Sequence, residues 1–429
     1  MPRVLPIAII TTAIASAQSP TVTLKLTLDD ALKRAEANAQ QLLSAELAAR
    51  FAREDAVQAK AALLPSLNWQ NGFIYTQPNG TDTGVFIAAN APREYINQAD
   101  MHADIYAPGK RADYQVALAG EAIARARVAI TQRGLVETVV QNYYAMVAAA
   151  RHLGNAQRSL QEARQFVDLT QKQEAGGEAA HSDVVKAQLQ FDQRARDVQE
   201  AQLVLDKARI GFAVLLFPDF RQDFAVVDDL DQVTPLPALP EIESLARKSN
   251  PDVQAAQAAV RQGFYGVKSA RAALLPTLSL DYFFGLQASQ YAVHNQFGQN
   301  NIGSSVVASL SVPVWNWGAL RSRIRQAELR MQQARTDLAF TERQLFANIN
   351  AFYFEANAAS TQISSLKHSL DLSEESLRLT ILRYEAGEVS VLEVVDAQNT
   401  VLGARNAYVD GLARYRVALG ALQTLTGVL

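Results

Sequence analysis

The chain has 429 residues, a formal net charge of −3 at pH 7 and no cysteine. The nearly balanced charge gives no sign of a nucleic-acid-binding surface. The lack of cysteine excludes disulfides, thiolate metal sites, a cysteine nucleophile and a lipidated N-terminal cysteine.

Residues 1–17 have the layout of a secretory signal peptide. Arg3 precedes an apolar run from Val4 to Ile14, and Ala15-Ser16-Ala17 follows it. A membrane anchor is the alternative, but a spanning helix needs about 20 apolar residues and this run has about 12. We therefore expect cleavage after Ala17 and export of the mature chain to the periplasm, the outer membrane or the medium.

The rest of the chain contains an internal repeat. The stretch KAALLPSLNW begins at Lys60, and the similar stretch RAALLPTLSL begins at Arg271. Further pairs follow in the same order: Tyr143-Tyr144 with Phe352-Tyr353, Glu174-Ala175-Gly176 with Glu385-Ala386-Gly387, and Asp183-Val184-Val185 with Glu393-Val394-Val395. We predict a first repeat at 18–217, an inter-repeat linker at 218–240 and a second repeat at 241–429.

Helical periodicity covers most of each repeat. The predicted helices are 28–63, 109–174 and 178–217 in the first repeat, and 241–274, 318–388 and 388–427 in the second. From Leu345 to Tyr384 the positions of the pattern alternate steps of four and three, which is typical of a left-handed coiled coil. The longest helix would reach on the order of 100 Å, far more than a globular domain needs.

Between these helices the apolar pattern has a period of two. It predicts strands at about 65–76, 95–107, 276–289 and 302–314, each with one apolar and one polar face. Strands of about ten residues with this alternation are typical of a transmembrane barrel. A soluble sandwich is the alternative, but aromatic residues near the strand ends favour an interfacial girdle; they are Trp69, Tyr75, Tyr282, Trp315 and Trp317. The loops at about 77–94 and 289–303 are polar and indicate no ligand.

Four prolines mark the predicted junctions between helices and strands. Pro65 and Pro276 stand where a helix ends and a strand begins, and Pro108 and Pro313 stand near the opposite crossing. Proline disfavours helical geometry in the residue before it and donates no backbone hydrogen bond.

Four strands are too few to close a barrel within one chain. In lipid, each open sheet edge leaves unpaired N–H and C=O groups that cost several kcal/mol each. Two copies would give eight strands and a filled interior, whereas three would give twelve strands and a lumen. The polar inward faces favour three copies.

The chain resembles the TolC family of outer-membrane efflux and export channels. The resemblance rests on the signal peptide, on the duplicated order of helix, two strands, long helix and helix, and on the segments Arg383–Gly387 and Leu392–Ala397. The resemblance covers essentially the whole mature chain. It implies a mainly α fold in which long coiled-coil helices form a periplasmic α-barrel and four strands per chain join a trimeric 12-stranded transmembrane β-barrel.

The resemblance also implies a function and partners. The chain would be the passive outer-membrane exit duct of a tripartite efflux or type I secretion system, gated at its periplasmic tip by a docking adaptor. The implied partners are two further copies of the chain, a periplasmic adaptor, an inner-membrane pump and outer-membrane lipid. The resemblance implies no cofactor and no metal. It also does not identify the cargo.

The family's tip residues can be carried over by position. The two helix turns that would meet the adaptor contain Ala175, Gly176, Gly177, Ala386 and Gly387. Each of these residues can equally be an ordinary turn residue.

The family's gate residues follow these turns. Glu393 and Asp396 hold the positions of its lumen-facing carboxylates, and a spacing of three puts both on one helix face. Three chains would form a ring of carboxylates, for which we expect cation selectivity and pH sensitivity. Taken without the resemblance, the two side chains could be part of a solvated helix face.

A gate latch is also implied. Tyr384 matches a tyrosine that bonds to an aspartate after the first turn, here Asp183, with Ser182 beside it. Val389 stands where channels of this family can carry an arginine as a second latch, so that part is absent.

Other functions have weaker support. The five histidines are scattered without metal-ligand spacing; they are His102, His152, His181, His294 and His368. With no phosphate loop or nucleophile motif, we expect no enzyme activity. The remaining alternative is a soluble periplasmic coiled-coil protein such as an adaptor, for which four aromatic-edged alternating strands are not expected.

Overall fold

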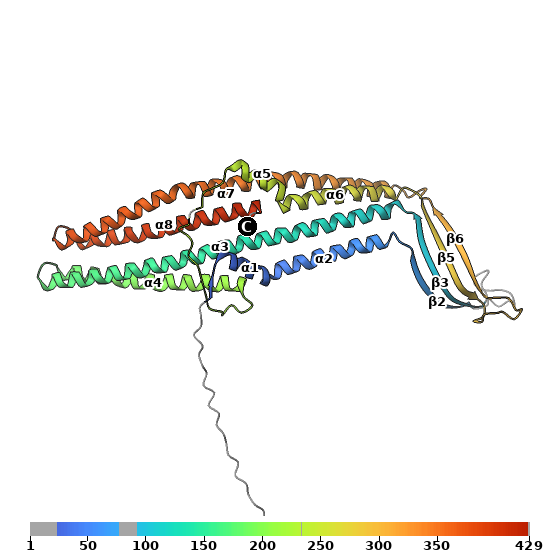
Figure 1. Cartoon of the computed structure of the whole chain (residues 1–429), viewed down its shortest axis with the longest axis horizontal. Coiled ribbons are helices and arrows are strands. Elements are labelled where there is room, and N and C mark those ends of the chain that lie inside the picture. Colours follow the sequence, from blue (N-terminus) through green and yellow to red (C-terminus); the bar gives the residue numbers. More distant parts are fainter. Residues whose placement is uncertain (1–23, 77–91, 233, 428–429) are drawn as a thin grey trace, which may run out of the picture. The chain divides into compact units, whose positions relative to one another are not determined.

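We describe a computed structural model of the chain over residues 24–76, 92–232 and 234–427. The predicted signal peptide and most of the predicted loop at 77–94 lie outside these residues. The described elements, in chain order, are β1 Leu24–Leu26, α1 Leu28–Asn38, α2 Gln40–Ala61, β2 Ser66–Tyr75, β3 Arg93–Tyr106, α3 Pro108–Ala175, α4 His181–Leu216, β4 Phe224–Val226, α5 Leu239–Ser249, α6 Pro251–Ala272, β5 Thr277–Ala288, β6 Ile302–Ser311, α7 Ala319–Glu385 and α8 Val391–Thr426 (Figure 1).

Two of the predicted helices are each divided in two. The prediction of one continuous helix at 28–63 is wrong, because α1 ends at Asn38. The side-chain amide of Asn38 donates to the carbonyl of Leu216 at 2.8 Å. The helix predicted at 241–274 is also wrong, because Asn250 is extended and caps a new helix. Its Oδ1 accepts from the backbone N–H groups of Asp252 and Val253, and Pro251 occupies the first helical position.

The compact units of the chain cut across its two sequence repeats. Among the described residues, one unit contains 24–38, 136–232, 234–236 and 355–420, and the other contains 39–76, 92–135, 237–354 and 421–427. Since α3 and α7 each supply residues to both units, neither repeat forms a unit alone.

The first unit is helical and contains one short sheet. Strands β1 and β4 pair in parallel, from Leu24 with Phe224 to Leu26 with Val226. β4 lies inside the predicted linker, so that linker contains regular structure that the sequence pattern did not reveal. Buried aromatic rings pack beside it, with the centroids of Phe212 and Phe224 6.1 Å apart.

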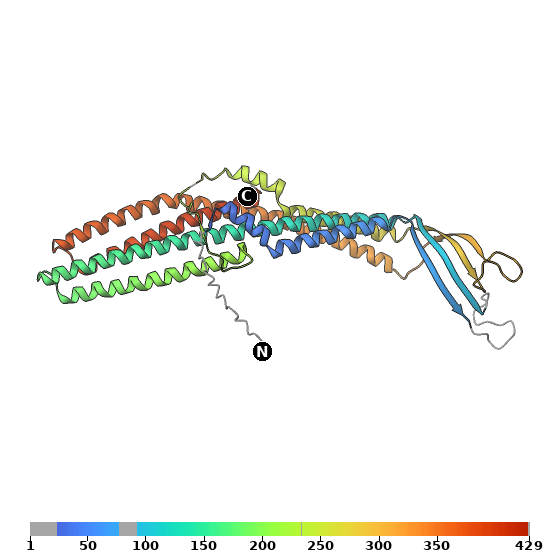
Figure 2. The same cartoon turned by 60° about the horizontal axis from the view of Figure 1, so that its bottom comes forward.

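The second unit contains the four-stranded antiparallel sheet, in the order β2-β3-β5-β6. Both views show the four strands side by side (Figures 1 and 2). The central pairing places His102 opposite Asp281, whose side chains are hydrogen-bonded at 2.6 Å, on the polar face. In this order the edge strands are β2 and β6, and within the described residues each is paired on one side only.

Candidate functional site

The candidate site lies in the first unit, where α3 turns into α4 and α7 turns into α8. Both turns end their helix on a glycine in the left-handed region, with φ of +78° at Gly177 and +77° at Gly387. Such a residue closes a helix because glycine adopts this conformation without a Cβ penalty. The N–H of Gly177 donates to the carbonyl of Glu174 at 2.9 Å, and that of Gly387 donates to Tyr384 at 3.0 Å.

The remaining tip residues predicted from the sequence lie in the same two turns. Ala175, Gly176 and Ala386 are exposed, and Gly176 donates to the carbonyl of Lys172 at 3.0 Å. The space around Gly177 and Gly387 is open, since a Cβ added at either would meet no heavy atom within 4 Å. The two turns therefore present small residues and accessible backbone.

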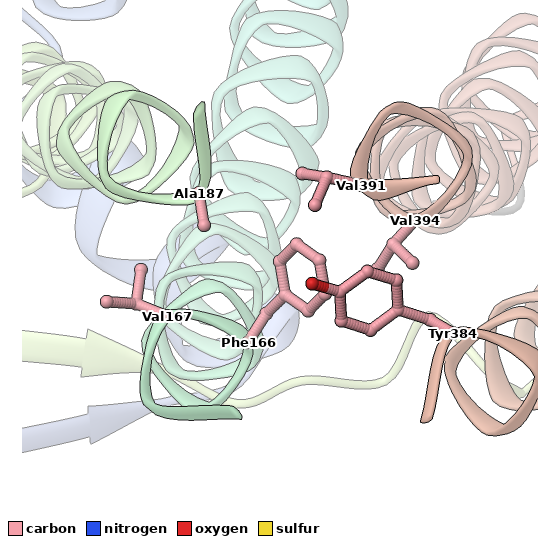
Figure 3. Close-up of a cluster of buried hydrophobic side chains, with 6 residues drawn as sticks. All are labelled: Phe166, Val167, Ala187, Tyr384, Val391 and Val394. Carbon is pink, nitrogen blue, oxygen red and sulfur yellow. The ribbon is translucent and has the colours of Figure 1, made fainter. Parts of the chain in front are cut away.

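Below the turns, a cluster of buried side chains joins all four helices. Its members are Phe166, Val167, Ala187, Tyr384, Val391 and Val394. Figure 3 shows the ring of Tyr384 reaching from α7 toward the ring of Phe166 on α3, and the two centroids are 5.1 Å apart. The side chain of Tyr384 thus belongs to an apolar core.

The hydrogen bond predicted between Tyr384 and Asp183 is absent from this structure. Tyr384 is 5% exposed, and its hydroxyl oxygen is buried with no hydrogen-bond partner among the described residues. In Figure 3 this oxygen points toward the ring of Phe166. The carboxylate of Asp183 instead pairs with Lys186 on its own helix at 3.2 Å.

The physical reason is that packing, rather than a polar partner, positions the tyrosine. The aromatic contact with Phe166 and the valines of α8 occupies the ring, while Asp183 finds a cation one turn along α4. Ser182, the third predicted latch residue, is exposed at the start of α4. In this arrangement of the helices the three residues do not form the predicted bond, and the latch itself stays a prediction.

Glu393 and Asp396 both lie exposed in the first turns of α8. Val394, between them in sequence, is fully buried in the apolar cluster, so the two carboxylates lie on the face that points away from it. Glu393 accepts a long hydrogen bond of 3.5 Å from the N–H of Ser390. Within the described residues neither carboxylate has an ion pair, so both charges are available to solvent or to ligands.

The predicted junction and girdle residues lie in the second unit. Pro65 and Pro276 stand directly before β2 and β5, Pro108 is the first residue of α3, and Pro313 lies between β6 and α7. The five aromatic residues are exposed, from 36% for Tyr282 through 62% for Tyr75, 63% for Trp69 and 75% for Trp315 to 89% for Trp317.

Sequence reasoning missed a polar network in the first unit. The network holds residues 224–232, a segment that we call the linker strap. Arg151 on α3 donates to Asp228 at 2.8 Å and to Asp231 at 2.6 Å. Asp229 pairs with Arg416 on α8, and the hydroxyl of Tyr143 donates to the carbonyl of Val227 at 2.6 Å. The three aspartates within four residues of the predicted linker were the available signal.

The pKa shifts in the strap follow from this geometry. The hydrogen bond from Arg151 holds the pKa of Asp231 below its usual value. Burial lowers the pKa of Arg151, but its hydrogen bonds to Asp228 and Asp231 outweigh this effect and raise it overall. Burial raises the pKa of Tyr144, beside the strap, to about 12. All of these groups therefore keep their ordinary charge near neutral pH.

In the part of the chain that the structure describes, no helix combines the length and the apolar character needed to cross a bilayer.

Comparisons with known proteins add to this geometry. The family model described as outer membrane efflux protein matches residues 31–216 and again residues 243–428. The alkaline protease secretion protein AprF of Pseudomonas aeruginosa is 24% identical over 381 residues, which cover 86% of this chain and 78% of AprF. The pyoverdine export outer membrane protein OpmQ of the same organism is 25% identical over 417 residues, which cover 93% of this chain and 85% of OpmQ.

A solved structure with the same fold is that of the outer membrane protein VceC from Vibrio cholerae. Its TM-score is 0.82 at 18% sequence identity, and the match covers 93% of this chain and 96% of VceC. At this identity the match establishes the fold.

Proposed function

We propose, on the premise that this chain belongs to the outer membrane efflux protein family, that three copies form a passive outer-membrane exit duct opened at its periplasmic tip by a docking adaptor. Members of this family are outer-membrane efflux and secretion channels rather than enzymes. The chain is accordingly a channel protein of the outer membrane. The trimer, the adaptor and the gate are the proposed parts.

The sheet of the second unit carries the proposal. Its edge strands β2 and β6 each have one side without a partner strand among the described residues. Such an edge is costly in hydrocarbon, because each unpaired backbone group loses several kcal/mol of hydrogen bonding. Pairing β6 of one copy with β2 of the next removes every edge, and three copies give a twelve-stranded barrel with a lumen.

The polar face of the sheet suits the lumen of such a barrel. His102, Asp104 and Asp281 share that face, and Asp104 forms an ion pair with Lys110. The opposite face carries exposed apolar side chains such as Leu67, Val306 and Leu310. This division places the polar groups in water and the apolar groups in lipid.

The turns of the first unit suit the tip of the duct. Three copies would bring Glu393 and Asp396 together as a ring of carboxylates, which attracts cations at the narrowest point. Tyr384 would hold the helix pairs together through the apolar cluster, and an adaptor contacting the exposed glycine turns would shift that packing. Energy for export would come from the inner-membrane pump.

The cargo is assigned to no class. One relative is named for alkaline protease secretion and another for pyoverdine export. Because both names accompany similar chains, we propose that the inner-membrane partner selects the cargo.

Membrane fractionation tests the proposal. The protein should be in the outer-membrane fraction, migrate as a trimer that heating converts to monomer, and conduct ions in planar bilayers. A water-soluble monomer in the periplasmic fraction would favour the adaptor alternative and contradict the duct.

A further inference from the structure

An exposed segment joins β6 to α7 at one end of the sheet in the second unit. Figure 2 shows it as a loop between the strand and the helix. Its apolar side chains are unusually open to solvent, with exposed fractions of 88% for Val314, 75% for Trp315 and 89% for Trp317. The rings of the two tryptophans pack edge to face, with centroids 5.7 Å apart.

The backbone of this segment has an unusual conformation at the second tryptophan. Trp317 has a φ of +53° and is the only non-glycine residue with a positive φ in the described part of the chain. A bulky side chain rarely adopts this conformation, and such outliers concentrate where a binding role maintains them. Asn316 fixes the start of α7 by accepting from the N–H of Ala319 at 3.0 Å.

Three arginines follow the tryptophans. Arg321, Arg323 and Arg325 are exposed, and none has an ion pair or side-chain hydrogen bond within the described residues. Between residues 302 and 327 the sequence contains these three arginines and no acidic residue. The matching junction of the first repeat differs, because its Lys110 is already paired with Asp104.

The segment is continuous with the apolar face of β6. Val306 and Leu310 lie along that face and are 62% and 66% exposed, and Val312, the first residue after the strand, is 54% exposed. In the duct proposed above this face lies in lipid, and the segment then lies where the hydrocarbon ends on the helical side of the barrel. Tryptophan rings prefer that depth, and arginine side chains extend from it toward phosphate groups.

We propose that residues 314–325 form a binding surface for anionic phospholipid of the periplasmic leaflet. The rings of Trp315 and Trp317 contact the acyl-chain boundary, and Arg321, Arg323 and Arg325 bind the negative headgroups. The occupant is a lipid rather than a second copy of the chain, because the start of α7 adds three cations to the segment and the exposed apolar side chains here continue those of the lipid-facing strand. The inference rests on the proposed function.

Tryptophan fluorescence can test this surface directly. The chain has three tryptophans, so a Trp69→Phe variant leaves only the pair in the segment. This variant is placed in vesicles that contain brominated phosphatidylglycerol or brominated phosphatidylcholine at equal mole fraction. We expect the anionic lipid to quench the tryptophans with about tenfold higher apparent affinity, and high salt to reduce the difference.

Two further variants in the same background separate local binding from net charge. Replacing Arg321, Arg323 and Arg325 with glutamine should abolish the preference. Arg330→Gln combined with Arg335→Gln should leave it unchanged, because these exposed arginines lie farther along α7. Equal quenching by the two lipids before any arginine is changed, or equal effects of the two sets, would overturn the inference.

The same vesicles distinguish this inference from the proposed function. If the trimer forms and conducts ions but shows no lipid preference, only the lipid surface is wrong. The segment is instead a contact between copies if two results occur together: bromine does not quench the tryptophan pair of the Trp69→Phe variant, and a separate variant with Trp315→Ala and Trp317→Ala no longer forms the trimer. If no trimer inserts at all, the proposed duct fails first.

Discussion

The side chain of Tyr384 and the carboxylates of Glu393 and Asp396 lie near one another in the fold but in opposite surroundings. The hydroxyl of Tyr384 is buried and has no hydrogen-bond partner in the described part of the chain, which costs about 1–3 kcal/mol, while its ring packs against Phe166. The two carboxylates are exposed, and neither forms an ion pair with any residue that the structure describes. The tyrosine therefore acts through packing and the carboxylates act through charge.

Tyr384→Phe should keep the tip as firmly packed as the native chain, or more firmly. The substitution removes an unpaired hydroxyl and retains the ring, so we expect a gain of about 1 kcal/mol in the stability of the helical unit. Tyr384→Ala should lose about 3 kcal/mol by leaving a cavity in the cluster. In planar bilayers, the alanine variant should raise basal conductance and the phenylalanine variant should not.

A latch that depended on the hydroxyl gives the opposite order. Higher conductance from Tyr384→Phe, equal to that of Tyr384→Ala, would contradict the packing role.

Replacing Glu393 with glutamine and Asp396 with asparagine should remove the charge of the proposed ring while keeping its size. We expect cation-over-anion selectivity to fall several-fold and block by divalent cations to weaken, because the pore would lose its focused negative field. Reversal potentials in a salt gradient measure this effect. Glu385→Gln, an exposed carboxylate at the same turn, is the matched control, and an equal effect from it would place the constriction elsewhere.

The linker strap and the four-stranded sheet are held in place by different kinds of contact. The strands are positioned by backbone pairing along their whole length, whereas the strap is held by a short parallel pair and by side-chain ion pairs. Its Asp228 and Asp231 are 44% and 67% exposed, so solvent screens their pairing with Arg151. The strap is therefore the more easily released element.

Arg151→Gln should loosen the strap without unfolding the helices. We expect the amides of residues 224–232 to exchange hydrogen about three- to tenfold faster at neutral pH, measured by mass spectrometry. Arg158→Gln, at an exposed position on the same helix, is the control. Unchanged exchange in Arg151→Gln would show that the β1–β4 pairing and the contacts from Arg416 and Tyr143 hold the strap without Arg151.

The same contact predicts a pH dependence. Because the pKa of Asp231 is lowered in the folded chain, its contribution is complete above the unfolded value near 3.8 and is lost as the pH falls through the folded value. Exchange of the strap, corrected for the intrinsic rate, should therefore rise below about pH 4 in the native chain. The rise should be smaller in Arg151→Gln, which lacks the pairing.

For the whole molecule, the decisive feature is that one chain cannot satisfy its own sheet. Both edges of β2-β3-β5-β6 are open in the described residues, and the apolar face of the sheet is largely exposed. In the proposed duct, identical neighbours would pair both edges, and lipid would cover the apolar face.

Cysteine crosslinking tests this closure in a chain that has no native cysteine. Single cysteines scanned along β2, each combined with one along β6, should give a ladder ending at a covalent trimer in intact outer membranes. Pairs that combine β6 with the inner strand β3 are the control and should give no ladder. A ladder that stops at dimer, or equal crosslinking in both sets, would reject the twelve-stranded barrel.

The sequence by itself determined the duplication, the family and the strand positions. Residues 60–69 and 271–280 repeat one pattern, and a period of two marked β2, β3, β5 and β6 to within a few residues. The family matches and the related fold confirm the predicted resemblance and fold class. Such features are local, since a proline or an alternating strand is recognised from its neighbours in sequence.

Only the tertiary structure decided what meets across distance. It showed that Tyr384 packs on Phe166 instead of bonding Asp183, and that the linker pairs with Arg151 and Arg416. It also showed that the helices predicted at 28–63 and 241–274 break at Asn38 and Asn250. These outcomes depend on partners far apart in the sequence, which compete for the same side chain, and no local pattern records which partner prevails.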